Sequence, residues 1–270
     1  VVQPTHLMHG AEYDELMEAV DAYKDKFESV KVAEPLLGEV GADASAINAD
    51  KKAVAEAITA EAVKTAGFDT LDAAKEDGVA FVFMGHGTSH TAKVSYSQMQ
   101  AQMKDLGYEN VFIGTVEGEP EETACENVIN AVAEAGYTKV VLRPLMVVAG
   151  DHANNDMAGD EDDSWKSAFE KEGYEVTCLL RGLGENACDL FVTLLLGLAG
   201  EEYVTAARLT FAGKRLQQIL LGPCTFNALF HNLILFSVCR LFPYSKDRKI
   251  PDNSPNYLHR LFLYGYSDYL

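Results

Sequence analysis

Residues 79–90 read VAFVFMGHGTSH, and the fold can first be inferred from this stretch. Residues 79–84 form a short, wholly apolar run, which is typical of a strand buried on both faces of a parallel sheet. Gly85, His86 and Gly87 follow directly, and flanking glycines let the backbone turn tightly. We therefore expect a buried strand that delivers His86 to the carboxyl edge of a sheet.

Apolar runs and helical patterns alternate after this strand. We expect three further strands, at 110–116, 139–149 and 174–180. We expect helices between them, at 95–106, 119–135 and 162–172. Pro120 suits the first turn of its helix, and Pro144 predicts that regular pairing bends or ends within its strand. The alternation indicates βαβ units and a parallel sheet.

Residues 1–76 repeat this pattern less completely. We expect strand segments at 1–3 and 30–37, and helices at 11–29 and 50–66. Because the chain opens at Val1 on what resembles the end of a strand, we expect the first units of this domain to be missing. The predicted organisation is the remainder of an N-terminal α/β domain (1–76), an α/β domain that carries the chemistry (77–195) and an atypical tail (196–270).

The composition of the tail differs from that of the rest of the chain. Residues 196–270 hold eight basic and five acidic residues, and 12 of the 26 aromatic residues. We expect this segment to be either foreign to the fold or poorly ordered. Its most apolar stretch, residues 226–242, is shorter than the ~20 apolar residues of a spanning helix and contains polar residues, so we do not expect it to cross a membrane.

Charge and cysteine content exclude several function classes. The net charge is −19, and a field of that sign repels phosphate backbones, so we do not expect a nucleic-acid partner. The five cysteines are odd in number and show no C-x-x-C spacing, which argues against a disulfide framework and a cysteine zinc site. We expect a cytoplasmic protein, and leave the periplasm open because any leader would precede Val1.

Three predicted strands end in residues that can bind a metal. His86 follows the first strand, Glu117 the second and His152 the third. Carboxyl ends of parallel strands meet at one edge, and two imidazoles with one carboxylate suit a divalent metal with open positions. Each residue also has a simpler interpretation, as a hydrogen-bonded loop histidine or a helix-capping glutamate. No G-x-x-x-x-G-K-[ST] motif is present, so we expect no ATP and no organic cofactor.

Several segments resemble the anaerobic, ATP-independent cobalt chelatases of cobalamin biosynthesis, the sirohydrochlorin cobaltochelatases. The main segments are FVFMGHGTSH (81–90), GTVEG (114–118) and RPLMVVAGDHANNDMAGDEDDSWK (143–166). VVQPTHLMHGAEYDEL (1–16) and LLRGLGEN (179–186) are further segments. The resemblance covers roughly residues 1–193, and the GDHANNDMAGD segment is its most specific part.

The resemblance implies two chelatase-like (Rossmann-like) α/β domains with parallel sheets flanked by helices, and a tetrapyrrole cleft between them. It implies that His86, Glu117 and His152 hold Co²⁺ as the substrate metal, with His86 and Glu117 as catalytic residues and His86 as the acceptor of pyrrole protons. It also implies substrate contacts, at Pro4, Thr5, His6, Gly85, Gly87, His90 and Met146.

The expected activity is insertion of Co²⁺ into the tetrapyrrole sirohydrochlorin. Because that substrate carries many carboxylates, we expect Arg143, Lys93 or backbone N–H groups to supply positive charge. The alternatives are a nickel or iron chelatase, since affinity order alone does not select cobalt, a non-catalytic tetrapyrrole- or metal-binding protein, and a metal-free interaction domain. A homo-oligomer remains open.

Overall fold

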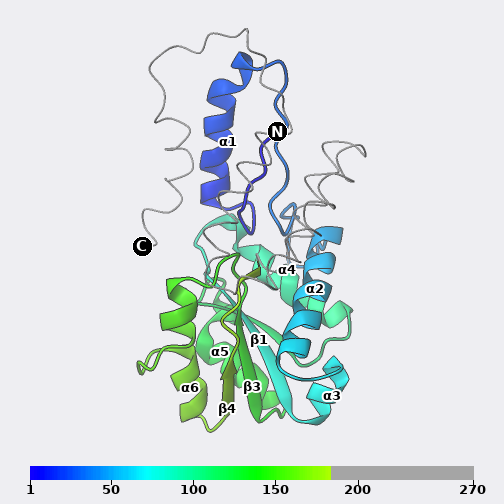
Figure 1. Ribbon diagram of the computed structural model, residues 1–270, viewed down its shortest axis with the longest axis vertical. Coiled ribbons are helices and arrows are strands. Elements are labelled where there is room, and N and C mark those ends of the chain that lie inside the picture. Colours follow the sequence, from blue (N-terminus) through cyan, green and yellow to red (C-terminus); the bar gives the residue numbers. More distant parts are fainter. Residues whose placement is uncertain (184–270) are drawn as a thin grey trace, which may run out of the picture. The chain divides into compact units, whose positions relative to one another are not determined.

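The structure is a computed structural model that describes residues 1–183 (Figure 1). These residues belong to one compact unit of the chain. The tail at 196–270, with its apolar stretch at 226–242, lies outside the described residues. Within residues 1–183, no helix is both long enough and apolar enough to cross a membrane.

Four parallel strands form the sheet, in the order β2-β1-β3-β4. Their bounds are β1 Val79–Gly85, β2 Val111–Thr115, β3 Lys139–Pro144 and β4 Glu175–Cys178. The four strands predicted from these parts of the sequence are confirmed, and β3 ends at Pro144, as its proline predicts. β1 pairs with β2 on one side and with β3 on the other, so the apolar run is a central strand.

Side chains of β1 alternate between two hydrophobic cores, because successive strand residues point to opposite faces. One core receives Val79, Phe81 and Phe83. The other receives Ala80, Val82 and Met84. Every residue of β1 is buried, which explains why the run is apolar throughout instead of alternating with polar residues.

Helices cover both faces of the sheet (Figure 1). The first core takes residues from α2 (Ala49–Thr65), α3 (Leu71–Glu76) and α4 (Val94–Asp105). The second takes residues from α5 (Cys125–Glu134) and α6 (Trp165–Lys171). The chain therefore leaves β1 over one face, through α4, and leaves β3 over the other, through α6. The carboxyl ends of β1 and β3 form a topological switch point, where open α/β sheets bind ligands.

The prediction of one helix over residues 119–135 is wrong. A short 3₁₀ turn spans Glu121–Thr123, and α5 begins only at Cys125. Ala124 between them is extended (φ −61°, ψ 146°). The Thr123 hydroxyl donates to the Pro120 carbonyl at 2.6 Å, which closes a turn ahead of the helix and leaves Pro120 outside it.

Other helix boundaries shift by smaller amounts, and one helix has no predicted counterpart. α6 begins at Trp165 because the Ser164 hydroxyl accepts the Ser167 N–H at 3.1 Å. α4 is preceded by a 3₁₀ turn at Thr91–Lys93. The unpredicted helix is α3, which Thr70 caps by accepting the Ala73 N–H at 3.1 Å.

The N-terminal segment has less regular structure than the sequence predicts. The helix predicted for 11–29 is α1, Ala11–Tyr23, followed by a 3₁₀ turn at Lys24–Lys26. The strand predicted for 30–37 is wrong, since one parallel bridge, Val2 to Val32, stands in its place. The structure therefore has one α/β sheet in residues 1–183, and the division at 76 remains a prediction.

Lys51 on α2 ties this N-terminal segment to the rest of the fold. Its side chain is fully buried, and Nζ donates to the carbonyl oxygens of Leu37 at 2.9 Å and Glu39 at 2.7 Å. Burial lowers the pKa of Lys51 to about 8, although nearby Asp50 acts in the opposite direction. The uncharged amine is thus favoured in the folded protein more than in the unfolded chain.

Stability should therefore depend on pH through Lys51. Because its pKa is lower in the folded state, its contribution to the free energy of unfolding should rise from about pH 8 to about pH 10.5. Urea denaturation of wild type and Lys51→Met across this range should show the difference in unfolding free energy shifting in favour of wild type as pH rises. Lys52→Met, at the neighbouring exposed position, should show no such trend; a flat difference for Lys51→Met would contradict the assignment.

Gly114 on β2 should tolerate no side chain. A Cβ at this position would overlap the Trp165 ring of α6, so Gly114→Ala should lower the free energy of unfolding by about 1–3 kcal/mol, the usual cost of overpacking. Gly150→Ala is the control, because a Cβ there meets nothing within 4 Å. Equal urea midpoints for the two variants would contradict the prediction and show that the Trp165 ring can move away from a Cβ at residue 114 without loss of stability.

Candidate metal and substrate site

Three segments that carry predicted metal ligands begin at the carboxyl edge of the sheet. His86 follows β1 directly, Glu117 lies two residues beyond β2, and His152 lies beyond β3. The N–H of Leu145 donates to the Met84 carbonyl at 2.7 Å, so the chain leaving β3 stays beside the end of β1. The switch point is therefore the place where both histidine-bearing segments emerge.

His86 and His152 lie in contact at this edge. Their ring centroids are 4.5 Å apart, with the rings nearly perpendicular at 84°. His152 directly precedes a π-helical turn at Ala153–Met157, and its Nδ1 lies 2.7 Å from Oδ2 of Asp156. The structure thus brings together the two imidazoles that sequence reasoning selected from separate strand ends.

The ring of His86 is oriented by its own loop. Its Nδ1 lies 2.9 Å from the Gly87 carbonyl oxygen. A carbonyl only accepts hydrogen bonds, so Nδ1 carries the proton of the neutral ring and Nε2 keeps its lone pair. A neutral imidazole with a free lone pair can bind a metal ion or accept a proton.

Tyr96 of α4 supports the turn that carries His86. Its hydroxyl accepts the Gly87 N–H at 3.2 Å, and its ring fills the space that a Cβ on Gly85 would occupy. Gly87 has a φ of +93°, which strongly favours glycine. Burial raises the pKa of Tyr96 to about 12, although hydrogen bonds from Gly87 and His86 oppose the shift. The tyrosine is a neutral phenol that fixes the turn.

Glu117 is joined to His86 through the main chain. Its N–H donates to the His86 carbonyl at 2.9 Å, and its Cβ lies 2.8 Å from the position of a Cβ on Gly87. The side chain is exposed. Across residues 1–183, no three His, Cys, Asp or Glu side chains are close enough to hold a metal. The two histidines meet, and Glu117 as third ligand remains a prediction.

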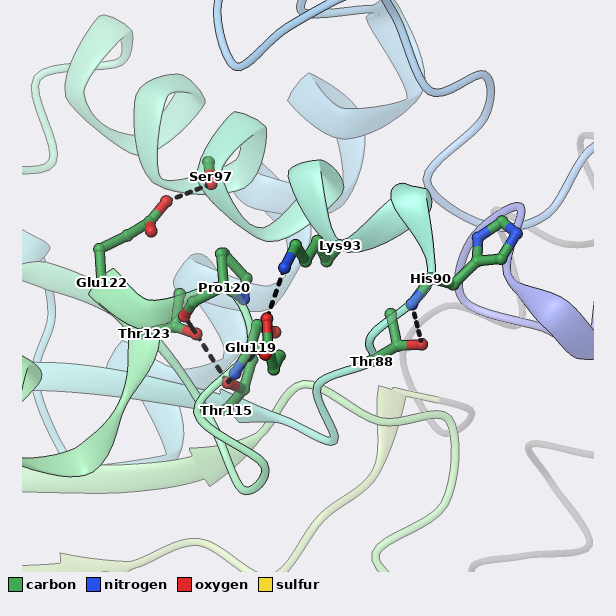
Figure 2. A network of polar contacts seen from close by, with 9 residues as sticks. All are labelled: Thr88, His90, Lys93, Ser97, Thr115, Glu119, Pro120, Glu122 and Thr123. Carbon is green, nitrogen blue, oxygen red and sulfur yellow. Dashed lines mark hydrogen bonds and ion pairs between the residues drawn. The ribbon is translucent and has the colours of Figure 1, made fainter.

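A polar network fixes the loop on which Glu117 lies (Figure 2). The hydroxyl of Thr115 contacts that of Thr123 at 2.6 Å and accepts the Glu119 N–H at 3.1 Å. Lys93 then pairs with the Glu119 carboxylate at 2.6 Å, and Ser97 donates to Glu122 at 2.5 Å. Both contacts tie the loop after β2 to the segment that follows β1.

The expected role of Lys93 and Arg143 as cations for the substrate is not supported. Lys93 is engaged by Glu119. The Arg143 side chain is buried under the first core, where it pairs with Glu61 of α2 and donates to the Ile58 carbonyl at 3.2 Å. Each of the two cations therefore forms an ion pair within the fold, Lys93 with Glu119 and Arg143 with Glu61.

His90 joins the loop after β1 to the N-terminal segment. Its Nδ1 accepts the Ala92 N–H at 3.1 Å, and its Nε2 lies 3.2 Å from the Asp14 carboxylate of α1. Because Nδ1 accepts, Nε2 carries the proton of the neutral ring, the opposite of His86. This tautomer gives Asp14 a donor and leaves no lone pair for a metal.

The remaining predicted substrate contacts lie on two segments. Pro4 is buried, Thr5 is exposed and His6 is half-buried; burial lowers the pKa of His6, with Glu12 opposing. Met146 follows β3, is half-buried, and its carbonyl accepts the Leu183 N–H at 2.8 Å. Contact of these residues with a substrate remains a prediction.

Sequence reasoning missed three residues that shape this site: Tyr96, Asp156 and Asp14. Asp156 lies four residues after His152, a spacing that places two side chains on one helical face, so the sequence contained a signal for this pair. The sequence contained no comparable signal for Tyr96 or Asp14, since each acts across a distance set by tertiary packing.

The chain is similar to a known protein family and to two curated proteins. Residues 1–195 match the family described as "Cobalt chelatase (CbiK)". The chain is 33% identical over 185 residues to the "Sirohydrochlorin cobaltochelatase" of Salmonella typhimurium, an alignment that covers 68% of this chain and 62% of that protein. It is 34% identical over 186 residues to the "Sirohydrochlorin cobaltochelatase CbiKC" of Nitratidesulfovibrio vulgaris, covering 68% and 58%.

The chain spans about three fifths of the length of these relatives. The family match includes both strand ends that carry His86 and His152, and all of the sheet. The resemblance found in the sequence motifs is confirmed: the chain belongs to the cobalt chelatase (CbiK) family.

Proposed function

We propose that this chain inserts Co²⁺ into sirohydrochlorin without ATP, with Co²⁺ and the tetrapyrrole as its two substrates. The observation that carries the proposal is the contact between His86 and His152 at the switch point, at a ring separation of 4.5 Å. Membership of the cobalt chelatase family and the names of the two relatives support it. Residues 77–195 carry the metal site in this proposal, and residues 1–76 contribute substrate contacts at Pro4, Thr5 and His6.

The proposed ligands are His86, His152 and Glu117. Two imidazoles and one carboxylate suit a borderline divalent ion and leave coordination positions for the ring nitrogens of the substrate. So small a ligand set can position Co²⁺ and still release it, whereas four thiolates would bind it too tightly to transfer. Glu117 reaches the metal by a side-chain movement, which its exposure allows.

Insertion replaces two pyrrole N–H bonds of the ring with bonds to cobalt, so two protons leave the substrate. The Nε2 of His86 keeps its lone pair because Nδ1 donates to Gly87, and a neutral imidazole is a suitable proton acceptor. One lone pair cannot hold Co²⁺ and a proton at once, so we assign His86 as the first acceptor at the moment its bond to the departing ion breaks, with the Glu117 carboxylate, released in the same way, as the second base. Gly85, Gly87, His90 and Met146 complete the surface proposed to contact the tetrapyrrole.

Replacing His152 tests the metal site. His152→Ala should slow cobalt insertion by at least about a hundredfold. Removing a residue that only hydrogen-bonds a metal ligand already lowers metal affinity or activity by about ten- to hundredfold, and His152 is proposed to bind the metal itself. The rate is followed by absorbance of sirohydrochlorin on mixing with Co²⁺. His9→Ala is the matched control, because His9 pairs with Glu34 on the N-terminal segment. Equal rates for wild type and His152→Ala would exclude the proposed site.

The same assay separates the alternatives. Faster insertion of Ni²⁺ or Fe²⁺ than of Co²⁺ would identify a chelatase for another metal. Stoichiometric Co²⁺ binding without insertion would identify a carrier. Unchanged Co²⁺ binding in His86→Ala and His152→Ala would point to a metal-free interaction domain.

Glu117 can be tested against a neighbour of the same type. Glu117→Gln keeps the side-chain shape and removes the charge, so it should weaken Co²⁺ binding and slow insertion by about tenfold or more. Glu119→Gln alters a carboxylate that already pairs with Lys93 and should cost less. Calorimetric titration with Co²⁺ gives the affinities. A larger loss for Glu119→Gln than for Glu117→Gln would reassign the third ligand.

A further inference from the structure

Asp156 contacts the ring of His152 from the same turn. Oδ2 of Asp156 lies 2.7 Å from Nδ1 of His152, at a spacing of four residues. The His152 side chain is 26% exposed and that of Asp156 44%. The π-helical turn at Ala153–Met157 carries the aspartate, so local backbone geometry places the carboxylate beside the ring.

This contact determines which nitrogen of His152 carries the proton. An ionised carboxylate only accepts, so Nδ1 donates and the neutral ring keeps its lone pair on Nε2. The partner of one ring nitrogen sets the tautomer and so decides which nitrogen is available to a metal. His152 therefore has the same tautomer as His86, whose Nδ1 donates to the Gly87 carbonyl.

His90 has the opposite arrangement. His90 accepts an N–H at Nδ1 and directs Nε2 toward the Asp14 carboxylate. An acceptor at Nδ1 places the proton of the neutral ring on Nδ1, whereas an acceptor at Nε2 places it on Nε2. His86 and His152 both belong to the first case, through a carbonyl in one ring and a carboxylate in the other.

We propose that Asp156 is a positioning residue that holds His152 as the Nδ1–H tautomer and so presents its Nε2 to the substrate metal. A carboxylate behind a ligating imidazole fixes the ring orientation and raises its basicity, as in carboxylate–histidine–metal triads. The metal part of this inference rests on the proposed function. The tautomer belongs to the metal-free protein and can be measured without any turnover.

The tautomer is tested by long-range ¹H–¹⁵N spectra of the metal-free protein with residues 1–270, recorded at a pH where the His152 signals are those of a neutral ring. The His152 signals are assigned by their loss in His152→Gln. Wild type should show a protonated Nδ1 and an unprotonated Nε2. Asp156→Ala should shift His152 toward the Nε2–H form, and Asp156→Asn should keep the wild-type tautomer because its amide oxygen still accepts. An Nε2–H tautomer in wild type would overturn the proposal whatever the variants do.

Co²⁺ binding to the same proteins provides the second measurement. Asp156→Ala should lower the affinity by about ten- to hundredfold, as removal of such partners generally does. Asp156→Asn should fall between Asp156→Ala and wild type, because it restores the hydrogen bond without the charge. Asp163→Ala removes an exposed carboxylate from the same connection and should bind Co²⁺ as wild type does. Equal losses for Asp156→Ala and Asp163→Ala would reduce the effect to net charge and overturn the proposal.

The two measurements separate this inference from the proposed function. A tautomer shift in Asp156→Ala supports the role of Asp156 in positioning even if wild type fails to insert cobalt, in which case the chelatase proposal alone fails. Normal insertion by wild type together with an unshifted tautomer in Asp156→Ala would leave the chelatase intact and overturn the role of Asp156.

Discussion

The site depends on the position of β1 between β2 and β3, with its two neighbouring crossovers on opposite faces of the sheet. A chain that leaves β1 toward α4 and leaves β3 toward α6 diverges at the carboxyl edge, where ligands of open α/β sheets bind. The parallel register extends to the pair Met84 and Pro144, the last paired residues before each chain turns away. Strand pairing by the main chain thus brings together two histidines that are far apart in the sequence.

The fold secures the three proposed ligands by different means. His86 and Glu117 share a main-chain hydrogen bond and rest on the turn that Tyr96 supports. His152 is held from its own turn by Asp156. Two cations of this part of the fold pair internally, Lys93 with Glu119 and Arg143 with Glu61. Under the proposed function, neither charge is reserved for the carboxylates of a substrate.

The central strand β1 was predictable because a strand buried on both faces is apolar throughout, as in residues 79–84, and such a run stands out from its surroundings. The helix predicted across Pro120 failed because hydroxyl contacts of Thr115 and Thr123, made after folding, outweigh local helix propensity. Arg143 was misjudged for a related reason: only the packing of α2 against β3 reveals its partner, Glu61. The histidines were found because the carboxyl ends of parallel strands lie at one edge of the sheet, although their contact requires β1 and β3 to be neighbours. The tautomer-setting partners depend on side-chain placement.

The glycines in the family-like motifs are needed for packing, whereas the histidines beside them are the candidates for chemistry. Gly85 makes room for Tyr96 and Gly114 makes room for Trp165, so both residues serve the assembly of the layers. A descendant of this chain that had lost its imidazoles would still need both glycines to pack Tyr96 and Trp165 in these positions. Motif similarity carried by the glycines therefore traces shared architecture, and shared chemistry has to be judged from the presence of His86 and His152.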